Sequence, residues 1–301
     1  MLEINRATKN NRLMKGLTGL SIKEFEILSL NFSRILYESK IRKDRKRAIG
    51  AGPIGKLIDD ASKLFFILFY LKIYPTCDLG GFVFGVDRSR ICRWANQFMP
   101  ILEKALGRSV RLPKRQISSV EELLKYFPEA EDLFIDGTER RTQRPKNPKT
   151  NRKRYSGKKK AHTRKNTIIC NEKKEILLVS KTKDGKIHDL TQLKKSGLID
   201  YLPPGITLWV DKGYKGITKY LKHNNAVMIP HKKSKKHPLT LQQKSDNAVI
   251  SGIRAVIEHA IGGIKRFGSM SNIYRNKHGQ DDQMIYLCAS LWNFHLQYKD
   301  C

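Results

Sequence analysis

The strongest constraint on the fold is a change of hydrophobic pattern near residue 130. Before this point apolar residues recur at the helical period, and after it come short apolar or β-branched runs typical of strands. The expected strands are 133–136, 167–170, 175–180, 207–211 and 226–230, with helices at 189–198, 247–267 and 281–298. The pattern predicts an α/β catalytic domain with a mixed sheet, preceded by an all-α domain.

The first half of the chain divides into helical segments and joints. Helices are expected at 22–37, 61–73, 76–106 and 121–126, the last with Ser118 or Ser119 as its N-cap. Residues 40–47 are basic and residues 50–55 are rich in Gly and Pro, which predicts a flexible joint. We therefore expect an N-terminal helical and basic segment (1–55), a helical domain (56–112) and the α/β domain (113–301).

The net charge points to a polyanionic partner. Lys and Arg number 59 against 28 Asp and Glu, a formal charge of +31, while 40% of the residues are apolar. That apolar content predicts a folded chain, so the charge belongs to a folded surface and favours nucleic acid over a membrane surface. The longest apolar run, Leu64–Leu71, is far shorter than the roughly 20 residues that cross a bilayer. With no apolar secretory signal at the amino terminus, a cytoplasmic location is expected.

Five scattered cysteines form no CxxC pair. Neither a disulfide framework nor a zinc site is therefore expected, and the thiols are predicted to be reduced and mostly buried.

A helix-turn-helix is predicted between Thr76 and Gln97. Gly81 is small where the helices would cross, Gly85 supplies a positive φ in the turn, and Asp87 is a good N-cap for the second helix. The outward positions of that helix carry groups suited to base edges and phosphates in a major groove: Arg88, Ser89, Arg90, Arg93 and Gln97. An ordinary helical hairpin with arginines on its solvated face is the alternative, and the global charge favours DNA binding.

A basic segment extends from Arg140 to Asn171 without an acidic residue. Self-repulsion predicts that it is disordered unless phosphates neutralise it. Because it lies between two expected strands, it should lie beside their ends and contact DNA there. Its candidate DNA-binding residues are Arg144, Lys158, Lys159, Lys160 and His162. A solvated mobile loop or a localisation signal is the alternative.

Three carboxylates are candidates for one site. Asp136 and Asp211 end expected strands, where side chains project into the ligand crevice of an α/β sheet, although Asp-Gly and Asp-Lys-Gly also occur in turns. Glu258 shares a helical stripe with Arg254 and Lys265, which also fits a surface salt-bridge stripe. Convergence of the three carboxylates would require cations, and two divalent ions about 3.5–4 Å apart would neutralise them and polarise a phosphodiester.

In combination these motifs resemble the DDE transposases of bacterial insertion sequences, and in particular the insertion-sequence-five family. Residues 71–90 are similar to the helix-turn-helix that precedes the catalytic domain there. The resemblance covers about residues 55–295 and is carried by residues 134–139, 144–148, 155–166 and 211–216 and by the spacing Arg254-x3-Glu258-x6-Lys265.

The resemblance implies a ribonuclease-H-like fold in which Asp136, Asp211 and Glu258 form the catalytic, metal-binding triad. Two Mg²⁺ ions, with Mn²⁺ as a possible substitute, would serve hydrolysis at the element ends and the attack of the freed 3′-hydroxyls on target DNA. Arg254 and Lys265 would contact the transposon-end DNA, and Ser251 stands where related transposases have a tyrosine. Double-stranded DNA is the implied partner, with a homodimer on paired ends and a nucleoid-associated, cytoplasmic location.

Two other classes of protein fit part of the pattern. A non-enzymatic helix-turn-helix regulator would use the same DNA-binding residues but predicts scattered carboxylates. A nuclease of RNA:DNA hybrids would use the same catalytic site, but a helix-turn-helix reads B-form major grooves that A-form helices close off.

Overall fold

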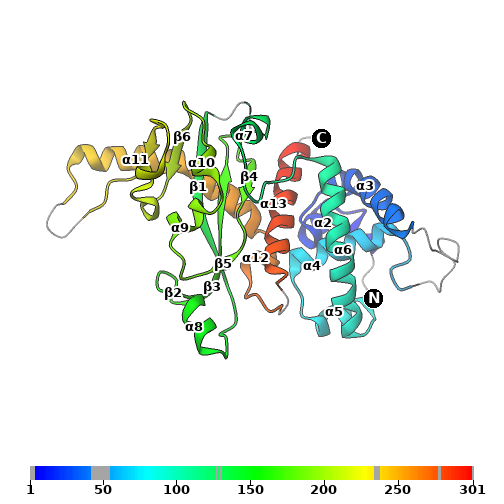
Figure 1. Ribbon diagram of the computed structural model, residues 1–301. Helices are drawn as coiled ribbons and strands as arrows, with labels where there is room; N and C mark the ends of the chain where they lie inside the picture. The colour runs from blue at the N-terminus through cyan, green and yellow to red at the C-terminus, as the bar shows by residue number, and fades with distance from the viewer. Residues whose placement is uncertain are drawn as a thin grey trace. The chain divides into compact units, whose positions relative to one another are not determined.

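The computed structural model describes residues 4–41, 55–126, 128, 131–233, 238–276 and 279–299 (Figure 1). The chain divides into two compact units. The helical unit comprises Met1–Leu112, Lys265–Asn272 and Gln283–Cys301, and the sheet unit comprises Pro113–Ile264 and Ile273–Asp282. The break at residue 112 agrees with the expected domain boundary. The expected joint at residues 42–54 lies outside the described residues.

The C-terminal residues differ from the expected division, because they group with the helical unit and not with the α/β domain. Their helix α13 (Asp281–Tyr298) is apolar along most of its length, and Leu287, Leu291 and Phe294 are fully buried. His295 Nδ1 also lies 2.6 Å from Glu24 Oε1. Apolar burial and this polar contact hold the end of the chain to the N-terminal helices, which sequence distance alone did not indicate.

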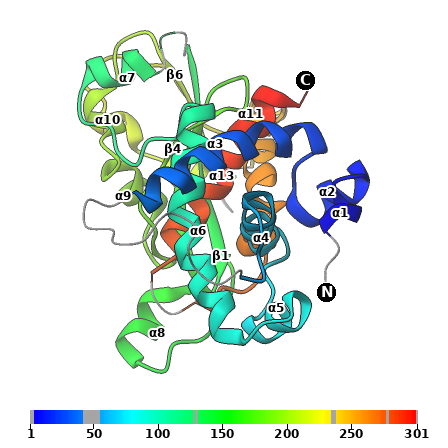
Figure 2. The same ribbon diagram turned by 90° about the vertical axis from the view of Figure 1, so that its right-hand side faces the viewer.

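Local caps determine where several helices of the helical unit begin. Ser21 and Glu24 form a capping box on α3, and Asp59 accepts a hydrogen bond of 2.6 Å from the Ser62 amide on α4. In Figure 2, α3 crosses α6, the helix against which it packs. The helices are α1 (Ile4–Ala7), α2 (Asn11–Thr18), α3 (Ile22–Lys40), α4 (Asp60–Ile73), α5 (Cys77–Phe84), α6 (Arg88–Ser109), α12 (Gly268–Ser271) and most of α13.

The helical unit has an aromatic core. Phe66 of α4 is 1% exposed, and its ring meets Phe84, Trp94 and Phe98 edge-on at centroid distances of 5.2–6.2 Å. These partners come from α5 and α6, so the same ring holds both helices of the helix-turn-helix against α4. Edge-to-face contacts of this kind add to the free energy gained by burying the rings.

The sheet is mixed, as the sequence predicts. Its strand order is β2-β3-β1-β6-β7, with β4 and β5 also paired to β3. β1 is antiparallel to β3 and parallel to β6, which is parallel to β7. The strands are β1 (Asp132–Arg141), β2 (Tyr155–Ser156), β3 (Ala161–Cys170), β4 (Ile176–Val179), β5 (Lys183–Asp184), β6 (Thr207–Val210) and β7 (Val227–Met228). All five expected strands are confirmed, and β1 and β3 extend beyond them.

Helices and a buried apolar cluster support the sheet. Ser119 Oγ accepts a hydrogen bond of 3.0 Å from the Glu122 amide, which confirms the expected N-cap region of α7. The cluster joins strand residues such as Ile135 and Val210 to Leu193 of α9. The remaining elements are α7 (Val120–Tyr126), α8 (Pro148–Arg154), α9 (Asp189–Lys194), α10 (Leu198–Tyr201), the 3₁₀ helices η1 (Lys212–Tyr214) and η2 (Ile217–Tyr220), and α11 (Leu241–Lys265).

The basic segment is folded, so the expectation of disorder is wrong for most of it. It forms α8, β2 and β3, and β3 pairs with β1 from Arg141↔Thr163 to Phe134↔Cys170. Acidic side chains from elsewhere neutralise two of its cations: Arg164 bonds to Asp184 and Asp281, and Lys165 bonds to Glu139 and Asp189. Strand pairing and these ion pairs replace the phosphates that the sequence argument required.

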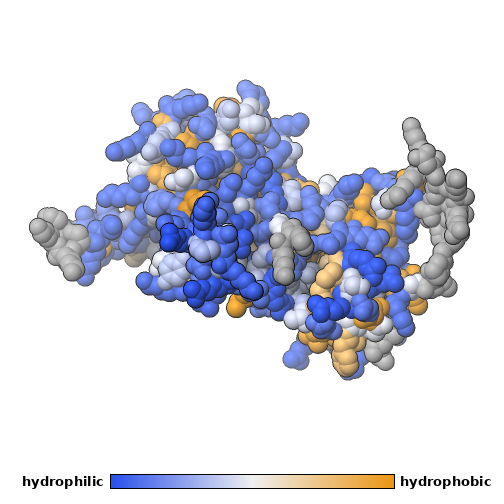
Figure 3. All heavy atoms as spheres, turned by 60° about the horizontal axis from the view of Figure 1, so that its bottom comes forward, coloured by the Kyte–Doolittle hydropathy of each residue, from blue (hydrophilic) through white to orange (hydrophobic). Residues whose placement is uncertain are grey.

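The four described cysteines are free thiols. Cys170 and Cys288 are buried as expected, whereas Cys92 is exposed and its Sγ lies 2.7 Å from that of Cys77. Among the described residues, no helix is both long enough and apolar enough to span a membrane. Hydrophilic side chains cover most of the face shown in Figure 3, in keeping with the charge of the chain.

Candidate active site

Two aspartates lie on neighbouring parallel strands, Asp136 within β1 and Asp211 directly after the end of β6. Ile135 of β1 pairs with Val210 of β6, and the next residues along the two strands are Asp136 and Asp211. Each carboxylate accepts a hydrogen bond of 2.7 Å from the following amide, Gly137 N–H and Lys212 N–H respectively. The parallel register therefore brings together two of the three predicted catalytic residues.

Two cations partly neutralise this aspartate pair. Arg254 Nη2 of α11 lies 3.4 Å from Asp136 Oδ2, and Lys158 Nζ lies 3.9 Å from Asp211 Oδ2. Burial raises the pKa of Asp136 above its ordinary value, and the charge of Asp211 raises it further, although the Gly137 amide, Arg254 and Lys158 act in the opposite direction. The two carboxylates are thus close enough to interact, and burial disfavours the negative charge of Asp136.

Glu258 does not join this pair. It is exposed, whereas Arg254, one turn earlier on α11, is buried, so the expected charged edge of the helix is divided between interior and surface. Among the described residues, no group of three or more His, Cys, Asp or Glu side chains is arranged to hold a metal ion. Lys265 ends α11 and is also exposed.

A third carboxylate, Asp189 at the start of α9, packs against Gly137 and Gly213, which follow the two aspartates in the chain, and was missed in the sequence. A Cβ on Gly137 would lie 2.8 Å from Asp189 Oδ1, and a Cβ on Gly213 would lie 2.7 Å from Asp189 Oδ2. Burial raises the pKa of Tyr214 well above its ordinary value, and the charges of Asp189, Asp136 and Asp211 all add to this shift. The negative charges of all three carboxylates thus act on this one buried hydroxyl.

A buried lysine fixes the position of Asp189. Lys165 Nζ lies 3.0 Å from Asp189 Oδ1 and 3.3 Å from Glu139 Oε1, and it donates to the Ile187 carbonyl. The sequence signal that could have indicated Asp189 is the glycine that follows each aspartate closely, Gly137 after Asp136 and Gly213 after Asp211. Gly137 lies inside β1 and not in a turn, so its small size serves the close approach of Asp189.

The helix-turn-helix has the predicted local geometry. Gly85 has φ +63°, and Asp87 caps α6 by accepting a hydrogen bond of 2.8 Å from the Ser89 amide. A Cβ on Gly81 would lie 2.7 Å from the Val86 carbonyl oxygen, which confirms the close crossing. The candidate DNA-reading residues Arg88, Ser89, Arg90 and Arg93, and also Gln97, are all exposed on α6.

The candidate DNA-binding residues of the basic segment fall into two places. Lys158, Lys159 and Lys160 are exposed in the turn between β2 and β3, and the contact of Lys158 with Asp211 places this turn beside the aspartate pair. Arg144 is exposed between β1 and α8. His162 on β3 is half-buried, with Nε2 3.0 Å from Asn151 Oδ1.

Asp136 and Asp211 match the ligand preference of a divalent metal ion. Mg²⁺ binds hard oxygen ligands and commonly takes one or two carboxylates, with water and substrate phosphates completing its shell. Burial raises the pKa of Asp136, so a metal ion bound at the pair would favour its ionised form, in addition to Arg254 and Lys158. The donor set of the pair fits a hard divalent ion, with Glu258 outside it.

Comparisons with known proteins agree with this arrangement. Residues 135–293 match the DDE superfamily endonucleases, and residues 55–108 match the helix-turn-helix of DDE superfamily endonucleases. The chain is 32% identical over 260 residues to a probable transposase for insertion sequence element IS702 from Microchaete diplosiphon, covering 86% of this chain and 88% of that protein. No solved structure matches the chain.

The matched regions coincide with the two features built above. The helix-turn-helix match contains α4, α5 and nearly all of α6, and the endonuclease match contains Asp136, Asp211 and Glu258. The finer placement in the insertion-sequence-five family stays a prediction. By the family match over half of its length and by its identity to the curated relative, the chain belongs to the insertion-sequence transposases of the DDE superfamily.

Proposed function

We propose that the chain binds the terminal inverted repeats of its insertion sequence, cleaves the DNA by metal-dependent hydrolysis and joins the 3′-hydroxyl ends to target DNA. The observation that supports this proposal best is the proximity of Asp136, within β1, to Asp211, directly after β6, the adjacent parallel strand. A non-enzymatic regulator predicts scattered carboxylates and gives no reason for this pair.

Asp136 and Asp211 would hold Mg²⁺, or Mn²⁺ in its place. The bound ions would polarise the scissile phosphodiester and activate the attacking water or 3′-hydroxyl. We infer that Glu258 turns toward the pair when DNA and metal bind. Support comes from its position one helical turn after Arg254, whose guanidinium already contacts Asp136. Arg254 would then exchange its carboxylate partner for a DNA phosphate.

Two surfaces would bind the DNA. On α6, Arg88, Ser89, Arg90 and Arg93 would read the terminal repeat, because the first turns of a recognition helix face base edges. Phosphates near the scissile bond would be held by Lys158, Lys159 and Lys160 of the β2–β3 turn, together with Arg144, His162, Arg254 and Lys265. We expect a homodimer on paired ends, since two ends need two active sites.

A cleavage assay on duplexes bearing the ends of the element tests the catalytic proposal. Asp136→Asn, Asp211→Asn and Glu258→Gln should each reduce Mg²⁺-dependent nicking to the level seen without enzyme, while DNA binding persists. Glu172→Gln is the matched control. Glu172 is exposed in the turn after β3, and its replacement removes one negative charge from the same unit. Wild-type nicking by Glu258→Gln would show that Glu258 is not a catalytic residue. Wild-type nicking by all three variants would contradict the catalytic proposal and favour a DNA-binding regulator.

The contributions of the two DNA-binding surfaces can be distinguished by how DNA affinity depends on DNA sequence and on salt concentration. Arg93→Ala should relax sequence preference by about 1–3 kcal/mol for each lost base contact. Lys158→Ala should weaken binding to any duplex and lower the slope of log K against log salt by about one. Equal losses on specific and random duplexes for both variants would exclude α6 from sequence reading.

A further inference from the structure

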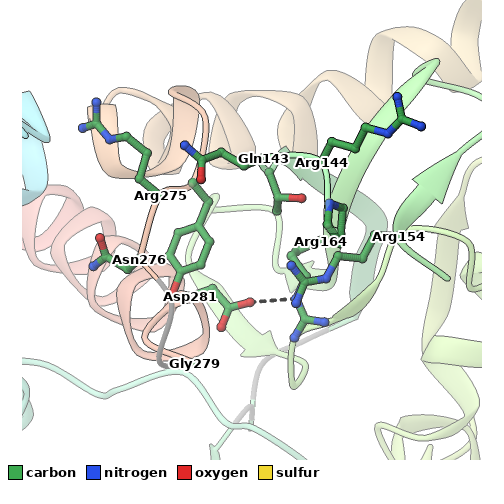
Figure 4. A pocket seen from close by; sticks show the side chains of 11 residues that line it. Gln143, Arg144, Arg154, Arg164, Arg275, Asn276, Gly279 and Asp281 are labelled. Atoms are coloured by element: carbon green, nitrogen blue, oxygen red, sulfur yellow. Dashed lines mark hydrogen bonds and ion pairs between the residues drawn. The ribbon is translucent and has the colours of Figure 1, made fainter. Parts of the chain in front are cut away.

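Two side-chain contacts outside the aspartate pair differ in their chemistry. In the sheet unit, Asp281 Oδ2 lies 2.8 Å from Arg164 Nε on the wall of a pocket of about 270 Å³ (Figure 4). In the helical unit, the Sγ atoms of Cys77 and Cys92 lie 2.7 Å apart, although the two residues are 15 positions apart in the chain. An ion pair can only open and close again, whereas two thiols in contact can be oxidised to a disulfide. The thiol contact can therefore change covalently.

The packing of the helix-turn-helix holds the two thiols together. Cys77 is the first residue of α5, which Thr76 caps with its hydroxyl. Further along the crossing, a Cβ on Gly80 would lie 3.2 Å from the Ile91 side chain, and Ile91 directly precedes Cys92. A disulfide bond is about 2.05 Å long, so its formation needs the two Sγ atoms to approach by less than about 1 Å. The two helices can thus be linked in the arrangement that they already have.

Cys92 lies within the surface that the proposed function assigns to sequence reading. It is exposed, and it comes four residues after Arg88 and three after Ser89, so it shares a face of α6 with both. Arg93 follows it directly and donates a hydrogen bond of 2.9 Å to Ser89 Oγ. A group attached to Cys92 would therefore stand where the bases of a duplex are expected.

The two thiols differ in accessibility and in acidity. Cys92 is exposed, whereas Cys77 is half-buried. Burial raises the pKa of Cys77 to about 11, the contact with Cys92 adds to this shift, and the charge of Arg88 acts in the opposite direction. Because the thiolate is the attacking form, an external disulfide reacts first at the accessible Cys92. Once Cys92 carries an adduct, its thiol no longer raises the pKa of Cys77.

We propose that Cys92 is a site of thiol–disulfide exchange on the DNA-reading surface and that Cys77 is its resolving thiol. The Cys92 thiolate attacks a low-molecular-weight disulfide, such as glutathione disulfide, forms a mixed disulfide and releases one glutathione thiolate. The Cys77 thiolate then attacks Cys92 Sγ and displaces the second glutathione thiolate, which leaves a disulfide between the two cysteines. The two-electron oxidation of the protein thiols balances the reduction of glutathione disulfide to two thiols, which take up the two protons.

The consequence for DNA binding rests on the proposed function of α6. Glutathione carries two carboxylates and one ammonium group, so an adduct on Cys92 adds bulk and negative charge beside Arg88 and Arg93. Both effects oppose the approach of a duplex. The intramolecular disulfide removes the adduct and leaves α5 and α6 in place. Resolution by Cys77 therefore protects the DNA-reading surface from external disulfides.

Mass spectrometry after exposure to glutathione disulfide tests the exchange. A Cys301→Ser background removes the fifth cysteine, which lies outside the described residues, while Cys170 and Cys288 are buried. The background protein should lose two hydrogen atoms, carry no glutathione and show Cys77 joined to Cys92 in a peptide map. Adding Cys77→Ser should leave one stable glutathione on Cys92, and adding Cys92→Ser should give neither product. A stable adduct on the background protein would overturn the proposal, as would glutathione on Cys77 in the Cys92→Ser protein.

DNA binding by the same proteins tests the protective role. Fluorescence anisotropy with an end-bearing duplex should give equal affinities for the dithiol and disulfide forms of the background protein. The glutathione adduct of Cys77→Ser should bind at least about tenfold more weakly than its reduced form, and dithiothreitol should restore the affinity. Equal affinity of adduct and reduced form, or a similar loss in the disulfide form, would overturn this role.

The two measurements keep the exchange separate from the proposed function. If no form of the protein binds the end-bearing duplex in preference to a random one, sequence reading by α6 is refuted, and the mass measurement still decides the exchange. If the Cys77→Ser protein fails to fold, the product formed by the background protein decides alone. An intramolecular disulfide there supports the exchange, and a persistent mixed disulfide refutes it.

Discussion

The helical unit and the sheet unit bury different kinds of side chain. Around Phe66 the helical unit buries aromatic rings contributed by three helices, and its charged side chains on α6 face solvent. The sheet unit instead buries Lys165 between the carboxylates of Glu139 and Asp189. Apolar packing thus supports the exposed charged surface of the helical unit, whereas the sheet unit holds paired charges in its interior.

The largest effect is expected from the aromatic core. Phe66→Ala removes the ring that joins α4, α5 and α6, and truncation of a buried Phe costs about 3–5 kcal/mol. The free energy of unfolding of the helical unit should fall by this amount in urea titration followed by circular dichroism. Phe82→Ala, on the neighbouring helix α5 but 87% exposed, should change it by less than about 0.5 kcal/mol. Similar losses for both variants would contradict the packing described for the helical unit.

Crowding at the aspartate pair should affect catalysis more than stability. Gly137→Ala forces a Cβ to within 2.8 Å of Asp189 Oδ1, so β1 or Asp189 must move. Displacement of catalytic groups by about 1 Å can cost about 100-fold in rate, and cleavage of end-bearing DNA should fall by this factor. Gly262→Ala on α11, where a Cβ meets nothing within 4 Å, is the matched control.

The double variant Gly137→Ala with Asp189→Ala separates crowding from charge. If Asp189 acts only by occupying space, the double variant recovers the rate lost in Gly137→Ala. If its charge positions Lys165 and the pair, the double variant stays as slow as Asp189→Ala alone. Unchanged cleavage by Gly137→Ala would show that the close approach of Asp189 has no part in catalysis.

Local chemistry made the helix-turn-helix and the strands predictable. The positive φ at Gly85 and the cap at Asp87 depend on neighbours within a few residues, and the apolar runs that identify β1 and β6 consist of consecutive residues before Asp136 and Asp211. The sequence argument expected both aspartates at strand ends, but β1 continues to Arg141, and it is the parallel register of β1 with β6 that brings them together.

Long-range contacts account for what the sequence did not predict. The acids that neutralise Arg164 lie 20 and 117 residues away, so the basic segment appeared more repulsive than it is. Helical periodicity placed Arg254 and Glu258 on one stripe but did not specify how α11 is rotated against the sheet. The approach of Asp189 to Gly137 and the pairing of Cys77 with Cys92 also depend on tertiary packing.

Thiol chemistry should differ between the units. Cys77 and Cys92 lie in contact across the helix-turn-helix, while Cys170 is buried in β3, and burial raises the pKa of its thiol. Treatment with diamide, which accepts the two hydrogen atoms, should form one intramolecular disulfide between Cys77 and Cys92, seen by mass spectrometry as a loss of two hydrogen atoms from the protein. In a model of unfolded-chain entropy the link raises unfolding free energy by up to about 3 kcal/mol. Cys92→Ser should abolish the link, and a disulfide involving Cys170 would contradict the burial of its thiol.

The smallest effect is a pair of opposite pH dependences. Burial raises the pKa of Asp136, with Asp211 adding to the shift, so the folded state holds this proton more tightly than the unfolded chain. Its contribution to stability therefore falls as pH rises above about 4, the ordinary aspartate value. In the helical unit, the hydrogen bond from Ser62 to the Asp59 carboxylate lowers the pKa of Asp59 despite some burial. Asp59 contributes stability above pH 4 that is lost on acidification.

Neutral amides at the two positions test these signs. Relative to wild type, Asp136→Asn should gain stability as the pH rises from 4 toward neutrality without metal, and Mg²⁺ should reduce the gain by binding the ionised pair in wild type. Asp59→Asn keeps a capping side chain but should lose stability over the same rise, since only the aspartate gains from ionisation. Thermal midpoints across this pH range measure both slopes. Slopes of the same sign would mean that the aspartate pair does not disfavour negative charge, which would weaken the argument for a cation at that place.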